Sequence, residues 1–138
     1  MTEDEARARV NAARVGRLAS VDRTGRPHVV PICFVLSRDR VVSVIDDKPK
    51  RTMRLRRLEN VKQNPDVQLI VDHYEDDWSA LWWVRISGRA RVAESGTTRD
   101  EAIHLLARKY SQYREHPPTG PVLVIDVTGI SGWRATGG

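Results

Sequence analysis

The sequence predicts a mostly β fold with inserted helices, arranged as a small antiparallel barrel of about six strands that is closed or nearly closed. Short β-rich runs recur along the chain, and turn residues or helices separate them. Only one strand–helix–strand passage occurs, over 46–71, and there is no GxGxxG motif, which argues against a parallel dinucleotide-binding sheet. A chain of 138 residues has the length of a single domain, which we expect to span 1–138.

The first half of the chain is expected to contain one helix and three strands. The segment Thr2–Glu5 has the form of a capping box and opens a weakly amphipathic helix. Two β-rich runs, 16–21 and 27–37, are separated by the turn residues 22–25 and predict a hairpin. A further strand is predicted over 41–45.

The second half of the chain is expected to continue the same alternation. Pro65 ends the helix that follows residue 50. Thr98 and Glu101 form a second capping box before apolar residues at helical spacing. The residues after 129 read as an irregular tail that contains Trp133. Strands are predicted over 67–73, 81–92 and 122–127.

Composition and charge favour a protein that binds a small anionic ligand. The formal net charge of +5 suits nucleic acids and acidic small molecules equally. Acidic clusters at 46–47 and 75–77 interrupt the basic surface and no RRM, KH or zinc-finger pattern occurs, so no nucleic-acid partner is expected. No apolar run approaches the roughly 20 residues of a membrane span, and the acidic N-terminus does not resemble a signal peptide. We therefore expect a cytoplasmic protein without a membrane partner.

Neither a metal site nor a catalytic side chain is predicted. The four histidines are scattered, and neither HExxH nor CxxC spacing occurs. The single cysteine, Cys33, lies in an apolar run, which is typical of a small buried residue rather than a nucleophile. No triad or pair of catalytic carboxylates is visible.

The cationic segment 46–64 is the strongest functional signal in the sequence. Lys50, Arg51 and Arg54 occur where a helix begins, although the helix dipole and the free N–H groups of a helix N-terminus favour an anion there. At 100° per residue, Arg51 and Arg54 continue the apolar face of this helix, so they are expected to point inward or toward a groove. This arrangement predicts a phosphate site, and a solvated basic face is the alternative interpretation.

The order of these elements resembles a known family. The stretches GRLASVDRTGRPHVVPICFVL and DDKPKRTMRLRRLENVKQNPDVQLIVD resemble the split β-barrel proteins that bind flavin or deazaflavin. Within the pyridoxamine-oxidase-like superfamily, the chain is most similar to the actinobacterial branch that depends on coenzyme F420. The similarity consists of a GRP turn, a proline-centred strand ending in an aromatic residue, and a Lys-Arg-rich turn before a helix followed by NP.V.

The resemblance implies a cofactor site with two parts. Lys50, Arg51 and Thr52 would hold the cofactor phosphate, with Arg54 one turn further along the helix. The strand that contains Pro31, Ile32, Cys33 and Phe34 would line the ring system. Without the resemblance, this strand reads as an ordinary buried barrel strand.

The resemblance also implies a homodimer in which the cofactor lies in a groove between protomers. Trp78, Trp82 and Trp83 are candidates for contacts supplied by the second chain, and packing in the core or at the dimer interface is the alternative. Of these we select Trp82, together with Trp133, as cofactor contacts. Simple anchoring of the tail is the alternative for Trp133.

The expected activity is hydride transfer between the reduced deazaflavin and an unsaturated organic acceptor, a small molecule. The proton would come from solvent or from Tyr74, Tyr110 or His73. The acidic tail of coenzyme F420 suits a basic groove better than FMN does. FMN with oxidase chemistry, a carrier that holds F420 without turnover, and a small basic nucleic-acid binder are the alternatives.

Overall fold

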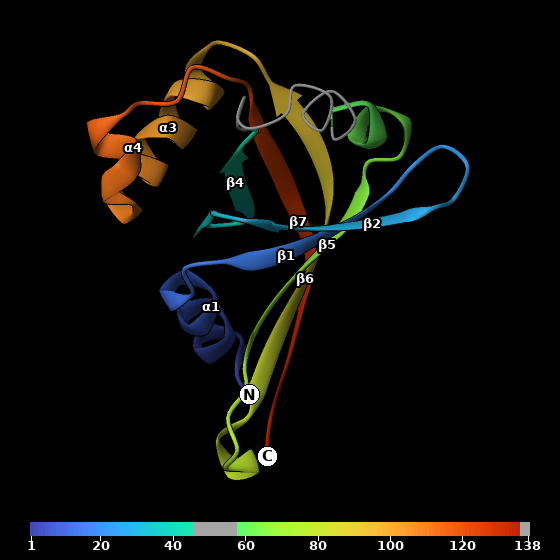
Figure 1. Cartoon of the computed structure of the whole chain (residues 1–138), viewed down its shortest axis with the longest axis vertical. Coiled ribbons are helices and arrows are strands. Elements are labelled where there is room, and N and C mark those ends of the chain that lie inside the picture. The colour runs from blue at the N-terminus through green and yellow to red at the C-terminus, as the bar shows by residue number, and fades with distance from the viewer. Residues whose placement is uncertain (46–57, 136–138) are drawn as a thin grey trace.

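The structure, a computed structural model, describes residues 1–45 and 58–135, and its main feature is one antiparallel sheet (Figure 1). The strands follow the order β2-β1-β5-β6-β7-β4-β3. Their bounds are Gly16–Val21 (β1), Pro27–Ile32 (β2), Val35–Ser37 (β3), Arg40–Val44 (β4), Asp66–His73 (β5), Trp82–Ala93 (β6) and Val122–Arg134 (β7). The mostly β class with inserted helices is confirmed, with seven strands instead of about six. Within the described residues the sheet is open, because no pairing joins its edge strands β2 and β3.

Helices lie at both ends of the strand order. The described helices are α1 (Glu3–Ala12), the 3-10 turn η1 (Trp78–Ala80), α3 (Thr97–Lys109), α4 (Ser111–Glu115) and helical backbone over 58–63. The first capping box is confirmed at its N-cap residue, because the Thr2 hydroxyl accepts the Glu5 N–H at 3.1 Å. The second is wrong, because α3 already begins at Thr97 and Gly96 caps it with φ 91° and no side-chain hydrogen bond. A glycine accepts that left-handed backbone without strain.

The strand predicted over 27–37 is divided into β2 and β3 at the β2–β3 corner, Cys33 and Phe34. At this corner the backbone groups of Cys33 and Phe34 are hydrogen-bonded to side chains instead of to a neighbouring strand. The Phe34 N–H donates to the Tyr110 hydroxyl at 3.0 Å, and the Cys33 carbonyl accepts from the Ser43 hydroxyl at 2.7 Å. Because the chain turns here, its two halves reach opposite edges of the sheet.

The expected irregular tail after residue 129 is also wrong, because β7 continues to Arg134. Trp133 pairs with Trp83 on β6, and the pairing slips once, so that Ser87 is opposite Gly129 while Gly88 is opposite Val127. Gly and Ser give this segment little hydrophobic signal, and its strand conformation depends on the long partner β6.

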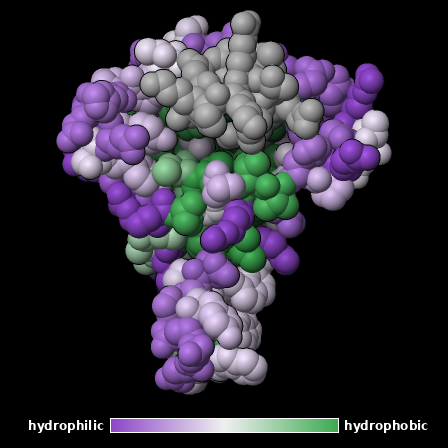
Figure 2. All heavy atoms as spheres, viewed as in Figure 1, coloured by the Kyte–Doolittle hydropathy of each residue, from purple (hydrophilic) through white to green (hydrophobic). Residues whose placement is uncertain are grey.

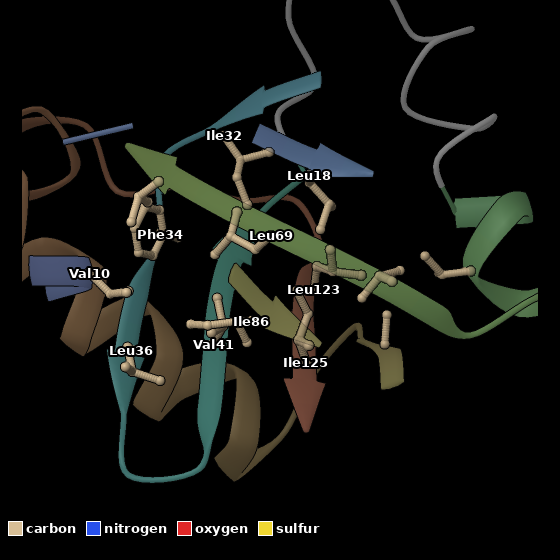
Figure 3. Close-up of a cluster of buried hydrophobic side chains, with 14 of the residues drawn as sticks. Val10, Leu18, Ile32, Phe34, Leu36, Val41, Leu69, Ile86, Leu123 and Ile125 are labelled. Atoms are coloured by element: carbon tan, nitrogen blue, oxygen red, sulfur yellow. The ribbon is translucent and has the colours of Figure 1, made fainter. Parts of the chain in front are cut away.

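Two apolar clusters hold the fold together. The larger lies between α1 and the sheet, and Figure 3 shows Leu18, Ile32 and Leu69 directed toward one another above Val41 and Ile86. The smaller packs α3, through Leu106, against β3, β4 and β7. The first four residues of strand β7, 122–125, alternate between the two clusters, so this part of the strand is buried on both faces.

Candidate functional site

The inner cavity, of about 130 Å³, opens between the β1–β2 hairpin, the end of β4 and the helical residues 58–63. Its apolar walls come from strand residues whose side chains face inward and from one helical residue. These are Leu18, Val30, Ile32, Val44, Ile45, Val61 and Leu123. A mostly apolar cavity is the usual setting of a small-molecule site when a few polar groups converge on it.

Polar side chains do converge on the inner cavity. Ser20, Ser43 and Asn60 are the buried polar side chains of the described residues, and all three line it. His28 adds an imidazole from β2. The Ser43 hydroxyl already donates to the Cys33 carbonyl, whereas Ser20, Asn60 and His28 present polar groups at the cavity that a ligand can contact, which favours a ligand site over ordinary core.

His28 is held by Asp22, which lies at the start of the hairpin turn. The His28 Nε2 lies 3.3 Å from Asp22 Oδ2. The other oxygen, Oδ1, accepts the Thr24 hydroxyl at 2.7 Å and the backbone N–H groups of Thr24 and Arg26. The Thr24 hydroxyl, followed by the Arg26 N–H, holds the pKa of the Asp22 carboxyl well below its usual range. Asp22 is therefore an anion at neutral pH, and Nε2 is the donor in this pair.

A second hollow, the polar recess of about 550 Å³, adjoins the inner cavity. It shares His28 and Asn60 with the cavity, so these two residues stand between an apolar space and a polar one. The remaining lining is charged or polar, from the hairpin turn and from the helical residues. It consists of Asp22, Arg23, Thr24, Arg26, Glu59 and Gln63.

The predicted phosphate ligands Lys50, Arg51, Thr52 and Arg54 lie outside the described residues. The described chain on both sides of them leads to the inner cavity. Ile45, which lines the cavity, precedes residue 46, and Asn60 and Val61 line it shortly after residue 57. The described residues that flank 46–57 on either side therefore line this cavity.

The four predicted residues of the ring-lining strand are not brought together. Ile32 lines the inner cavity, whereas Pro31 is exposed on the opposite face. Cys33 packs against the smaller cluster and Phe34 is fully buried in the larger one. Alternation along β2 and the turn at the corner account for this separation.

Trp82 and Trp133 both line a different hollow, the tryptophan recess of about 260 Å³ at the η1 end of β5 and β6, but they lie on opposite faces of the sheet because Trp133 pairs with Trp83. Trp83 and Tyr74 also line it. Trp82 is partly buried under Arg9, whose guanidinium carbon lies 4.8 Å from the ring centroid, while Trp133 is 46% exposed. The tryptophan recess shares no lining residue with the inner cavity among the described residues.

Lys109 and Tyr110, at the end of α3, form a polar cluster at the β2–β3 corner. Lys109 Nζ donates to the Phe34 carbonyl at 2.9 Å and lies 4.2 Å from the centroid of the Phe34 ring. Burial, aided by the nearby Arg14 charge, lowers the pKa of Lys109 to about 8, and burial also raises the pKa of Tyr110. These groups bind backbone atoms, so the cluster stabilises the corner.

Sequence reasoning missed Ser20, His28, Ser43 and Asn60. The visible signal was alternation in PHVVPI, which places His28 on the inner face of β2 with Val30 and Ile32. A polar residue on the inner face of this edge strand requires an explanation, and a ligand site supplies one.

Structural comparison shows the same fold in proteins of low sequence identity. A conserved hypothetical protein of Mycobacterium tuberculosis has a TM-score of 0.75 at 19% identity, covering 99% of this chain and 86% of that one. An FAD-binding protein of Mycobacterium smegmatis has a TM-score of 0.67 at 19% identity, covering 97% and 96%. The heme storage protein of Vibrio cholerae has a TM-score of 0.69 at 18% identity, covering 95% and 90%.

Family comparison extends over nearly the whole chain. No curated protein matches the sequence. Among the described residues, no helix has the length and apolar character needed to cross a membrane. Residues 2–134 match the model of the pyridoxamine 5′-phosphate oxidase family. With this match and the open antiparallel sheet, the chain belongs to the pyridoxamine 5′-phosphate oxidase family.

Proposed function

We propose that this protein is a coenzyme F420-dependent oxidoreductase that transfers a hydride between the reduced deazaflavin and an unsaturated organic acceptor. The observation that carries the proposal is the inner cavity, which is mostly apolar, is lined by the buried polar side chains, and is lined by described residues on either side of 46–57. The inner cavity supports the proposal as a candidate space for the ring system, and Lys50, Arg51, Thr52 and Arg54 remain the predicted phosphate ligands. The cofactor supplies hydride chemistry when bound, and the protein binds, orients and shields.

The proposed roles follow the chemistry of each residue. Lys50, Arg51 and Thr52 bind the cofactor phosphate, and Arg54 adds charge one turn later. Ile32 packs against the ring system from the cavity wall. Ser20, Ser43 and Asn60 offer hydrogen-bonding groups at fixed positions on rigid elements.

FMN is the alternative cofactor, and a carrier is the alternative role. FMN presents a phosphate that the same cations would bind, and a protein of the same fold from Mycobacterium smegmatis binds FAD. The heme storage protein of Vibrio cholerae likewise has this fold. We favour F420, because its acidic tail would use a basic groove that FMN leaves unfilled.

We further propose a homodimer in which each protomer completes the site of its partner. The inner cavity and the tryptophan recess share no lining residue in one chain. A cofactor that contacts both Ile32 and the predicted Trp82 or Trp133 would therefore bind the cavity of one protomer and the tryptophan recess of the other.

The test is calorimetric binding of F420 and of FMN to the wild type and to the double variant Lys50→Ala/Arg51→Ala. Because each charge-assisted hydrogen bond contributes about 1.5–3 kcal/mol, the double variant should bind F420 at least about tenfold more weakly. The matched control is Arg56→Ala/Arg57→Ala, which removes the same charge: at 100° per residue Arg56 lies away from the helix face that Arg51 and Arg54 continue, and Arg57 lies on its flank. Its affinity should stay within about threefold of the wild type.

Each outcome separates the candidate functions. Selective F420 binding supports the proposal, and oxidation of the reduced cofactor by an acceptor separates an enzyme from a carrier. FMN preference assigns the protein to flavin chemistry. Equal loss in both double variants would show only non-specific attraction and would remove the phosphate-site assignment.

A further inference from the structure

We infer that His28, held by Asp22, donates the proton that completes reduction of the acceptor, an inference that rests on the proposed function. The acceptor gains a hydride from the reduced cofactor at one atom of its double bond. The π electrons move to the other atom, and the His28 imidazolium protonates that atom. The acceptor is reduced by two electrons, the cofactor is oxidised by two, and the neutral imidazole recovers its proton from water.

The first argument is position. Among the described residues that line the inner cavity, His28 is the single titratable side chain. The surrounding walls are Leu, Ile and Val, which limit the access of water to a bound acceptor. A proton needed inside such a cavity is best supplied by a positioned side chain within hydrogen-bond reach.

The second argument is that the two carboxylate oxygens of Asp22 have different hydrogen-bond partners. Oδ1 receives all three hydrogen bonds of the turn, whereas Oδ2 faces His28 Nε2. Because the turn fixes the carboxylate, the carboxylate fixes the plane and the tautomer of the imidazole. Nδ1 is then the nitrogen that carries the transferable proton, and the negative charge of Asp22 stabilises the charged ring.

The third argument is a route for the proton. His28 also lines the polar recess, so the ring connects the apolar cavity to a hydrophilic space. The charged groups facing it there are Asp22, Arg23 and Arg26 from the hairpin turn and Glu59 from the helical residues. Water in this recess can return the proton to the ring after each turnover.

The other candidate proton donors, Tyr74, Tyr110 and His73, do not line the inner cavity as the structure describes it. The Tyr110 hydroxyl is engaged by the backbone of Phe34 and Arg14, away from the inner cavity. Tyr74 and His73 line the tryptophan recess, and His73 pairs with Glu75.

The experiment begins with a readout independent of turnover, the NMR signals of the histidine rings. The His28 signal is identified by its loss in His28→Gln. Adding F420 should shift it, while the signal of His116, exposed beyond α4, should not move. In Asp22→Asn, Oδ1 can still hold the turn but the charge opposite the ring is lost, so the His28 signal of the free protein should shift. If bound F420 leaves the NMR signal of His28 unshifted, the inference is wrong.

The kinetic readout uses reduced F420 and cyclohex-2-enone as the acceptor probe. His28→Gln should lower kcat about 100-fold, the usual contribution of a general acid, with the F420 dissociation constant within about threefold. His28→Gln should also change the pH profile of the rate, because the proposed proton donor is removed. The matched control His116→Gln should retain the wild-type rate and pH profile.

The experiments distinguish failure of the His28 inference from failure of the proposed function. If the wild type binds neither F420 nor FMN, the proposed function fails before any variant is made, and the inference fails with it. If the wild type binds F420 and reduces the acceptor while His28→Gln is equally fast, the inference alone is wrong. Loss of activity in His73→Gln with retention in His28→Gln would likewise overturn it.

Discussion

Tyr110 shows how one hydroxyl can fix a turn in a strand. It accepts the Phe34 N–H, and its single proton is shared between the carbonyl oxygens of Arg14 and Phe34 at 3.0 and 3.1 Å. Residues 14, 34 and 110 are thus joined at one point, where α1 leads into β1 and α3 ends. The β2–β3 corner depends on this long-range contact, because its own backbone has left the ladder.

We predict that Tyr110→Phe lowers the free energy of unfolding by about 1–3 kcal/mol, because it leaves the buried Phe34 N–H without its acceptor while preserving the ring packing. Urea denaturation measures this change. The control is Tyr74→Phe, whose side chain is 67% exposed and whose hydroxyl accepts only the Trp78 indole N–H in the described structure. A loss in the control equal to that in Tyr110→Phe would contradict the assigned role.

Predictions from sequence were least reliable for single residues whose surroundings depend on distant contacts. Ile32 was predicted to line the cofactor ring, and it lines the inner cavity, but whether it binds a cofactor stays a prediction. Phe34 was grouped with it, yet Phe34 is in the core because Tyr110 and Lys109 bend the strand between them. His28 looked like one scattered histidine until the hairpin placed Asp22 beside it.

Among the elements, the pairing of β6 with β7 contains a bulge at a glycine. Between Ser87 and Gly88 the register shifts, leaving Thr128 as the extra residue of β7. A Cβ placed on Gly88 would lie 2.5 Å from Ile125 Cγ2 and 2.6 Å from the Asp126 carbonyl oxygen. The backbone oxygen cannot rotate away, so the close approach of the strands requires glycine here.

We predict that Gly88→Ala destabilises the protein by about 1–3 kcal/mol, the usual cost of overpacking, as measured by thermal or urea unfolding. The matched control lies across the ladder, since Gly129 pairs with Ser87 and has nothing within 4 Å of an added Cβ. Gly129→Ala should change the free energy of unfolding by less than about 0.5 kcal/mol. Equal destabilisation of both variants would show that crowding at Gly88 is not the cause, because Gly129 has no neighbour that an added Cβ would meet.

Elements with local signals were predicted well, and elements that depend on a partner were not. Strands β1 and β5 alternate between buried and less buried residues, and their predicted ranges agree closely with the structure. The last part of β7 has no such pattern, because glycine and serine replace the apolar residues and β6 supplies the order. The start of α3 was misplaced because Gly96 caps it by backbone geometry, without a side-chain hydrogen bond.

At the scale of the whole molecule, one face of the sheet carries apolar groups at its surface. Figure 2 shows apolar residues gathered over β1 and β2, with hydrophilic residues around them. Val29 is 65% exposed on β2, Ile70 37% on β5 and Trp133 46% on β7. Strand pairing places Pro31, Arg17 and Ile70 on one rung, so the exposed apolar groups extend across neighbouring strands. Such a face suits the second copy that the proposed shared site requires.

We predict that Ile70→Glu weakens the dimer at least tenfold and weakens F420 binding with it. In a two-fold interface the substitution occurs twice, and each uncompensated charge taken out of water costs several kcal/mol. Sedimentation velocity measures the association, and calorimetry on the same samples measures the cofactor. The control is Val15→Glu, at a residue that is 40% exposed in the link between α1 and β1. A wild-type protein that sediments as a monomer while binding F420 tightly would contradict the shared site, because the inner cavity of one chain would then suffice.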